Sequence, residues 1–177
     1  MKDLLVEDFL KSIFLEKGLS ENTLLSYRND LNNAANILKS KKLSDIDNND
    51  LIKIISKWSK NFSIKSQNRM MSSLKQFFIW LKLENHRSDN ILANVQTPKA
   101  NASLPKIISE GDIEKLILES QKSTTKNSEK IHCIIELLYS TGMRVSELVN
   151  LSFGSVNNLE DTIIVMGKGG KERVVIL

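Results

Sequence analysis

The sequence is poor in the residues that interrupt regular structure or cross-link a chain. Its 177 residues include only 7 Gly, 2 Pro and 1 Cys. So few glycines and prolines favour long helices over a fold of many short strands. A single cysteine excludes an internal disulfide and a multi-cysteine zinc site, and no carboxylate or histidine cluster suggests another metal. No apolar run approaches the roughly 20 residues of a membrane-spanning helix, and the N-terminus lacks a signal peptide, so we expect a cytoplasmic protein with no membrane partner.

Basic residues are concentrated in the first part of the chain. Residues 1–105 hold 16 Lys and Arg against 11 Asp and Glu. Residues 51–83 contain no acidic residue, and their basic residues are Lys53, Lys57, Lys60, Lys65, Arg69, Lys75 and Lys82. A run of one sign is typical of proteins that bind the phosphate backbone of nucleic acids. A solvated helix face would have the same composition, so charge alone leaves both interpretations open.

Apolar residues at spacings of three and four predict helices through residues 1–93. Gly18 is expected to end a first helix, and Ser20 to cap the start of a second one. A third helix is expected through residues 51–58 and a fourth from about Ser66 to Leu83. Together these segments predict a small bundle of four or five helices.

The periodicity stops at residues 94–106, which contain both prolines and predict a linker between two domains, 1–93 and 107–177. The second domain is expected to hold helices and then a β-hairpin, with strands at residues 162–166 and 173–177 around a glycine-rich turn. The fold class is therefore mainly α, with an α+β second part.

Arg144 is the first residue that could carry chemistry. The break at Thr141 and Gly142 predicts that Arg144 lies in the first turn of a new helix. A forked guanidinium beside free backbone N–H groups can hold a phosphodiester through parallel hydrogen bonds. The alternative is an exposed arginine that forms a salt bridge with Glu147, three residues later.

The turn from Gly167 to Arg173 is the second such feature. Its glycines allow a close approach to another molecule, and its lysines, Lys168 and Lys171, could reach a phosphate. It is not a phosphate-binding P-loop, because the spacing differs and a strand follows where that loop needs a helix. A plain basic hairpin turn is the alternative. The remaining singular residues, Tyr27, Tyr139 and Cys133, lie in apolar helical stripes and are predicted to be core.

The order of these motifs is similar to that of a known family. Residues 139–148 (YSTGMRVSEL) resemble the first catalytic-arginine motif of tyrosine recombinases, and residues 167–173 (GKGGKER) resemble their hairpin lysine motif. Residues 18–27 (GLSENTLLSY) and 71–81 (MSSLKQFFIWL) resemble the core-binding domain of the Xer-type branch. Residues 104–106 (LPK) are similar to the start of that family's catalytic domain.

The resemblance implies a SAM-like helical domain that binds DNA, followed by the first part of a catalytic domain. It implies that Arg144 holds the scissile phosphate, that Glu147 orients Arg144, and that Lys168 protonates the leaving 5′ oxygen. A tyrosine would form a 3′-phosphotyrosine with double-stranded DNA at a core site, with neither metal nor cofactor, in a tetrameric synapse with a homologous recombinase. The residues expected to contact DNA are Thr23, Ser26, Arg28, Ser66, Arg69 and Lys171.

The second half of the family's active site cannot be located. The family has a His-x-x-Arg motif and a nucleophilic tyrosine that neither histidine and neither tyrosine of this sequence matches. We therefore expect a chain cut short within a strand, which does not cleave DNA by itself. The alternatives are a non-catalytic DNA-binding form of a recombinase and a helical interaction module; chromosome-dimer resolution is the expected role of the complete enzyme.

Overall fold

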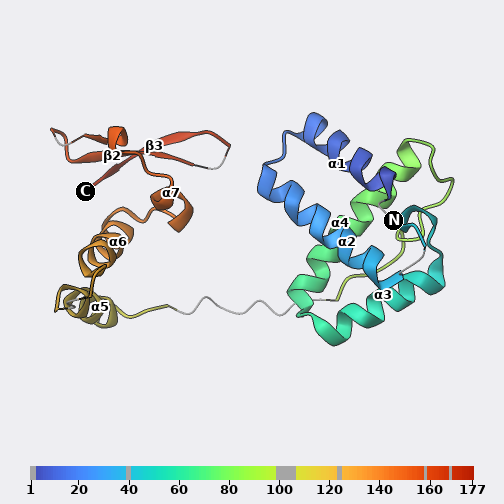
Figure 1. The fold of residues 1–177 in the computed structure, drawn as a ribbon, viewed down its shortest axis with the longest axis horizontal. Helices are drawn as coiled ribbons and strands as arrows, with labels where there is room; N and C mark the ends of the chain where they lie inside the picture. The colour runs from blue at the N-terminus through green and yellow to red at the C-terminus, as the bar shows by residue number, and fades with distance from the viewer. Residues whose placement is uncertain (1–2, 39–40, 99–106, 123–124, 158, 168) are drawn as a thin grey trace. The chain divides into compact units, whose positions relative to one another are not determined.

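The computed structural model describes residues 3–38, 41–98, 107–122, 125–157, 159–167 and 169–177 (Figure 1). The chain divides into two compact units, residues 1–103 and 104–177. Within the described ranges, no helix combines the length and the apolar character that a membrane span needs.

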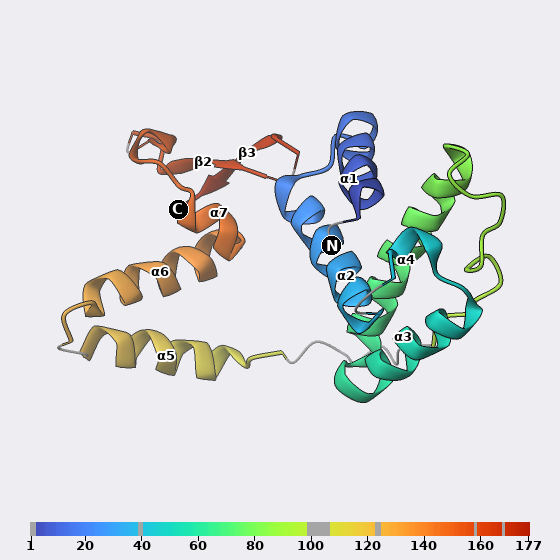
Figure 2. The same cartoon turned by 45° about the vertical axis from the view of Figure 1, so that its right-hand side comes forward.

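The described residues of the first unit form a bundle of four helices, which confirms the predicted fold class. Its helices are α1 (Leu4–Lys17), α2 (Glu21–Leu38), α3 (Asn48–Asn61) and α4 (Ile64–Leu83). A short 3-10 helix, Leu43–Asp45, precedes α3. Helix α2 contacts α1, α3 and α4, and Figure 2 shows it running through the unit beside α4. The two helices therefore share a long interface.

Capping residues set the helix ends. Gly18 ends α1 in the left-handed conformation (φ 55°), where its N–H donates to the carbonyl of Phe14. The hydroxyl of Ser20 accepts the N–H of Thr23 at the start of α2, as the sequence predicts. Helix α4 begins before the predicted Ser66, because the hydroxyl of Ser63 accepts the N–H of Ser66 and caps the helix there.

Aromatic residues dominate the core of the first unit. Its largest fully buried side chains are Phe9, Trp58, Phe77 and Phe78, and the rings of Phe9 and Phe77 meet edge to face with centroids 5.4 Å apart. Leu4, in contrast, is 76% exposed, because the buried stripe of α1 runs through Val6, Phe9, Leu10 and Ile13.

The second unit combines three helices with a small antiparallel sheet. Its elements are α5 (Glu110–Lys122), α6 (Ser128–Thr141), α7 (Val145–Val149), a 3-10 helix (Phe153–Ser155), β1 (Val156–Asn157), β2 (Thr162–Met166) and β3 (Glu172–Ile176). Strand order is β1-β2-β3, and the hairpin pairs Thr162 with Ile176 and Met166 with Glu172. The hairpin was predicted; β1 was not, because a strand of two residues leaves no periodic pattern.

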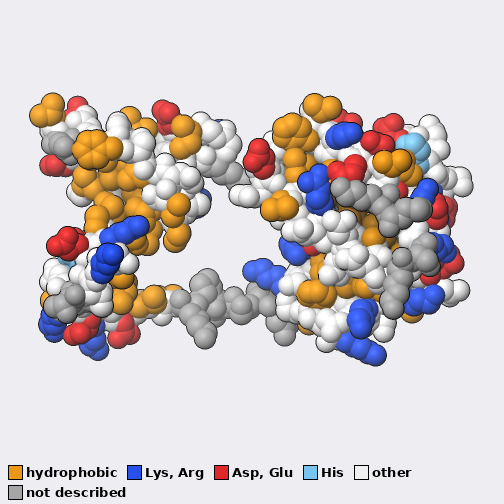
Figure 3. Space-filling model, viewed as in Figure 1, with side chains coloured by type: hydrophobic (Ala, Val, Ile, Leu, Met, Phe, Trp, Pro, Cys, Tyr) orange, Lys and Arg blue, Asp and Glu red, His pale blue; other side chains and the backbone are white. Residues whose placement is uncertain are grey.

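The core of the second unit is small. Its buried apolar residues are Met143, Ile163 and Val165. None of the described residues of α6 is buried: Tyr139 is 55% exposed and Cys133 is also exposed, so the prediction that both are core was wrong. Helix α6 packs against α5, α7 and β3, which leave much of its apolar surface in solvent. Apolar side chains are correspondingly prominent on the visible face of this unit (Figure 3).

Candidate functional site

The turn between α6 and α7 positions Arg144. Gly142 ends α6 in the left-handed conformation (φ 61°), Met143 is buried, and Arg144 is extended (φ −77°, ψ 151°) as the N-cap of α7. The prediction of Arg144 inside the first helical turn was therefore wrong by one residue. Since α7 has only five residues, its dipole adds little positive potential at its N-terminus. The positive charge at this position therefore comes mainly from the guanidinium of Arg144.

Glu147 is the centre of this site. Its side chain is only 5% exposed, and its two oxygens accept four hydrogen bonds from two arginines. Oε1 accepts Nη1 of Arg144 and Nη1 of Arg173, both at 2.8 Å. Oε2 accepts the backbone N–H of Arg144 at 2.7 Å and Nη2 of Arg173 at 2.8 Å. Arg173, on β3, thus makes a bidentate contact with the carboxylate.

The electrostatics of the cluster follow from these bonds. The hydrogen bonds from Arg173, then those from Arg144, hold the pKa of Glu147 well below its usual range. The carboxylate in turn raises the pKa of Arg173. Two guanidinium groups and one carboxylate leave a net charge of one positive unit. The side chain of Arg144 is 69% exposed and keeps N–H donors that Glu147 does not use, so the salt bridge to Glu147 is compatible with binding of an anion.

Gly167, at the start of the glycine-rich turn, lies beside this cluster. The N–H of Gly167 donates to the carbonyl of Lys171 at 2.7 Å. A Cβ on Gly167 would lie 3.1 Å from that carbonyl and 3.7 Å from Nη1 of Arg173, so a side chain would require the carbonyl to move by a few tenths of an ångström. Lys171 is exposed on the turn. Lys168, predicted to be the general acid, lies outside the described residues.

Three of the predicted DNA contacts share one hollow in the first unit. Thr23 and Ser26 of α2 and Arg69 of α4 line a hollow of about 330 Å³. Ser66 lies one helical turn before Arg69 on α4. Arg28 lies apart from them: its guanidinium pairs with Glu7 of α1 at 2.9 Å, and it lines two other hollows beside α1.

Arg69 is held by a buried carboxylate that sequence reasoning missed. The side chain of Asp30 is 3% exposed, and its Oδ2 accepts Nη1 of Arg69 at 2.7 Å and the hydroxyl of Ser73 at 2.8 Å. The available signal was that Asp30 adjoins Leu31 at the edge of the apolar stripe of α2, where a carboxylate needs a partner.

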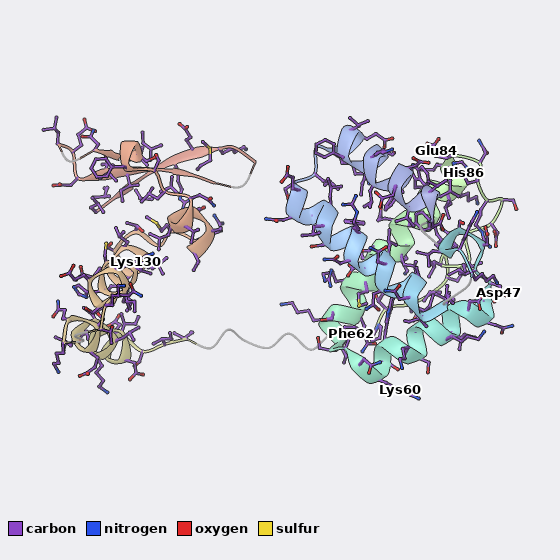
Figure 4. All side chains as sticks on the ribbon, viewed as in Figure 1. Asp47, Lys60, Phe62, Glu84, His86 and Lys130 are labelled. Carbon is purple, nitrogen blue, oxygen red and sulfur yellow. The ribbon has the colours of Figure 1, made fainter. Side chains whose placement is uncertain are left out.

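The acid-free segment gives α3 and α4 exposed positive charge. Lys57, Lys60 and Lys65 are exposed, whereas Lys53 pairs with Asp50 at 3.2 Å. Lys60 lies at the outer edge of α3 (Figure 4). Blue side chains lie along the lower border of the first unit in the space-filling view (Figure 3). Among the described side chains, no group of three His, Cys, Asp or Glu could hold a metal ion.

Family models match nearly the whole chain. Residues 6–85 match the phage integrase N-terminal SAM-like domain, and residues 106–177 match the phage integrase family. The tyrosine recombinase XerD of Rhizobium meliloti (strain 1021) is 38% identical over 181 residues, covering 97% of this chain. The chain belongs to the phage integrase family of tyrosine recombinases.

Other members of this family align along the same length. The tyrosine recombinase XerD of Neisseria meningitidis serogroup B (strain ATCC BAA-335 / MC58) is 35% identical over 177 residues, covering 99% of this chain. The chain spans 58% of the Rhizobium protein and 60% of the Neisseria protein.

Solved structures of tyrosine recombinases and integrases show the same fold. A lambda integrase(75-356) dimer bound to a COC′ core site has a TM-score of 0.76 at 18% identity, covering 97% of this chain and 60% of that one. The XerH site-specific recombinase bound to its difH substrate, in a pre-cleavage complex, has a TM-score of 0.64 at 21% identity, covering 98% and 62%. At these identities the likeness concerns the fold alone.

Proposed function

We propose that this chain carries the DNA-binding domain and the first catalytic residues of a Xer-type site-specific recombinase that acts on double-stranded DNA. The observation that carries the proposal is the Glu147 cluster, which holds an exposed arginine, Arg144, beside the glycine-rich turn. Its net positive charge and free guanidinium donors suit a phosphodiester. Chromosome-dimer resolution, together with a homologous recombinase in a tetramer, is the proposed role.

In the proposed reaction Arg144 holds the non-bridging oxygens of the scissile phosphate and stabilises their charge as the phosphorus becomes five-coordinate. A tyrosine hydroxyl loses its proton to water and its oxygen attacks the phosphorus, while the bond from phosphorus to the 5′ oxygen breaks. Lys168 gives that oxygen a proton, leaving a 3′-phosphotyrosine and a free 5′-OH. Attack by the 5′-OH of another strand reverses these steps. Neither Tyr27, in the first unit's core, nor Tyr139, on α6, is proposed as the nucleophile.

The first unit is proposed to bind DNA through the hollow between α2 and α4 and the basic surface of α3 and α4. We expect the affinity of the chain for duplex DNA to fall steeply with salt, with a log–log slope of magnitude roughly 4–8. Fluorescence anisotropy of labelled DNA between about 50 and 200 mM salt measures this slope. A flat response, or no binding at the lowest salt, would contradict the proposal.

The role of Arg144 is tested in the native protein. Arg144→Ala should lower the rate of strand cleavage at least about a hundredfold, because one charged donor to the transition state is lost, while core-site binding changes little. Lys115→Ala is the matched control, because Lys115 is exposed in the same unit and pairs only with the exposed Asp112. Equal losses of binding and cleavage in Arg144→Ala would make Arg144 structural.

Lys168→Ala should slow cleavage, and a substrate with a better 5′ leaving group should restore the rate, because such a group needs no proton. Without rescue, Lys168 is not the general acid. DNA binding with no cleavage by the native protein, even on such a substrate, would favour the alternative of a non-catalytic DNA-binding recombinase.

A further inference from the structure

Arg173 has no assigned role in the proposed reaction, yet it makes the bidentate contact in the site. It donates Nη1 and Nη2 to the two oxygens of Glu147, each at 2.8 Å, across 26 residues of sequence. Its side chain is 39% exposed, whereas that of Arg144 is 69% exposed. Both arginines contact the carboxylate, and Arg144 is the one with more of its side chain in solvent.

The second arginine determines how much charge Arg144 can offer. A carboxylate has about four lone-pair sites, and four N–H groups of the two arginines occupy one site each. Without Arg173, Glu147 would keep two of these bonds and a full negative charge beside Arg144. The guanidinium of Arg144 would then turn its fork to Glu147, and the local net charge would fall from one positive unit to zero.

The same residue connects this charge to the glycine-rich turn. Gly167 lies so close that a Cβ would be 3.7 Å from Nη1 of Arg173 and 3.9 Å from Oε1 of Glu147. Gly167 immediately precedes Lys168 in the sequence. A displaced Arg173 would therefore disturb both the backbone that leads to the lysine and the carboxylate that orients the arginine.

We propose that Arg173 is a positioning residue: by saturating the buried carboxylate of Glu147, it keeps the remaining N–H donors of the Arg144 guanidinium available and the cluster net positive for a phosphate. This inference rests on the proposed function, because it assumes that Arg144 binds a phosphate. Arg173 itself does not touch the reacting atoms in this scheme.

Side-chain NMR of the 177-residue chain tests the inference directly. The sequence has five arginines, so its Nε–H signals are few, and Arg144→Lys assigns that of Arg144. Inorganic phosphate is the probe, titrated while the Arg144 Nε–H signal is followed. We expect Arg173→Met to shift this signal even without phosphate, and to weaken phosphate binding about tenfold, the equivalent of one moderate ionic contact.

Two further variants separate positioning from other effects. Arg173→Lys keeps the charge but offers no planar fork, so it should restore part of the affinity, with a loss of about threefold. Lys115→Met removes the same charge from an exposed position of the same unit and should leave phosphate binding at Arg144 unchanged. If Arg173→Met fails to fold, the comparison of Arg173→Lys with the unaltered chain decides: weaker binding supports the inference and equal binding overturns it.

The outcomes distinguish the inference from the function on which it rests. No response of Arg144 to phosphate in the unaltered chain would overturn both. A response that is the same in Arg173→Met as in the unaltered chain would leave the anion site standing and overturn only the role of Arg173.

Discussion

Arg69 and Asp30 join α4 to α2 in the first unit, and removing the side-chain charge of Arg69 should cost more stability than removing that of Asp30. Nη1 of Arg69 lies 2.7 Å from Oδ2 of Asp30, which also accepts the hydroxyl of Ser73. The two partners differ in environment: the side chain of Arg69 is 55% exposed and that of Asp30 only 3%. If the pair is broken, water can hydrate the exposed guanidinium of Arg69 but hardly reaches the buried carboxylate of Asp30.

The expected magnitudes follow from this asymmetry. Arg69→Met leaves a buried carboxylate with a single hydroxyl donor, which should lower the free energy of unfolding by about 3 kcal/mol. Asp30→Asn leaves a neutral amide in the buried position and a half-exposed arginine that regains water, so the loss should be about 1–2 kcal/mol. The order of the two variants, with Arg69→Met the less stable, is the core of the prediction.

Tryptophan fluorescence in urea isolates the first unit, because Trp58 and Trp80 are the chain's two tryptophans and both lie in that unit's helices. With a slope of about 2 kcal/mol/M, a difference of 1 kcal/mol moves the midpoint by about 0.5 M. Arg28→Met is the matched control. Arg28 pairs with Glu7 where both side chains are substantially exposed, so its loss should cost less than about 1 kcal/mol.

Two results would refute the reasoning. The first is an Arg69→Met variant no less stable than Asp30→Asn, which would mean that the carboxylate of Asp30 is well hydrated when unpaired. The second is an equal loss of stability in Arg69→Met and Arg28→Met, which would mean that burial of the acidic partner does not affect the strength of the pair in this unit.

Two further predictions concern acid stability and the hairpin turn. A hydrogen bond from Lys41 lowers the pKa of Asp50 from 3.8 to about 2. The resulting stabilisation is complete above the unfolded-state pKa of 3.8 and is lost as the pH falls through the folded-state pKa of about 2. Asp50→Asn should therefore flatten the pH dependence of the urea midpoint between these two pKa values. Gly167→Ala places a Cβ 3.1 Å from the carbonyl of Lys171 and should shift the backbone amide signals of β2 and β3, whereas Gly154→Ala, with nothing within 4 Å, should not; equal shifts would contradict the close approach.

The helices of the first unit were predictable because their signals are local. Periodic apolar residues locate each helix, and Gly18 and Ser20 mark an end and a start by chemistry that acts within a few residues. The start of α4 was less well defined, since Ser63 and Ser66 are both plausible caps three residues apart. Only the observed hydrogen bond between them selects Ser63.

Burial in the second unit could not be predicted in the same way. A stripe of apolar residues on α6 shows which face is apolar, but whether another element covers that face is a property of the tertiary fold. Tyr139 and Cys133 were assigned to the core on periodicity and are exposed. The inward face of β2 did follow alternation, since Ile163 and Val165 are buried and Ile164 is not.

The candidate site was half predictable for a related reason. Arg144 and Glu147 are three residues apart, so their pairing follows from local geometry. The pairing of Glu147 with Arg173 depends on how the hairpin sits on α7. One signal was available: Arg173 shares the inward face of β3 with Val175, and an arginine at such a position needs an acidic partner.

Both units hold an exposed arginine with a buried carboxylate, and the charge balance separates their roles. Asp30 faces one arginine and a neutral hydroxyl, so that pair sums to zero. Glu147 faces two arginines, so that cluster keeps one positive charge. Because a phosphate is attracted by charge that is not already neutralised, Arg144 should respond to inorganic phosphate more strongly than Arg69 does. Arg69 would instead act through the direction of its remaining N–H donors, as a residue that sets the register of the DNA on the first unit.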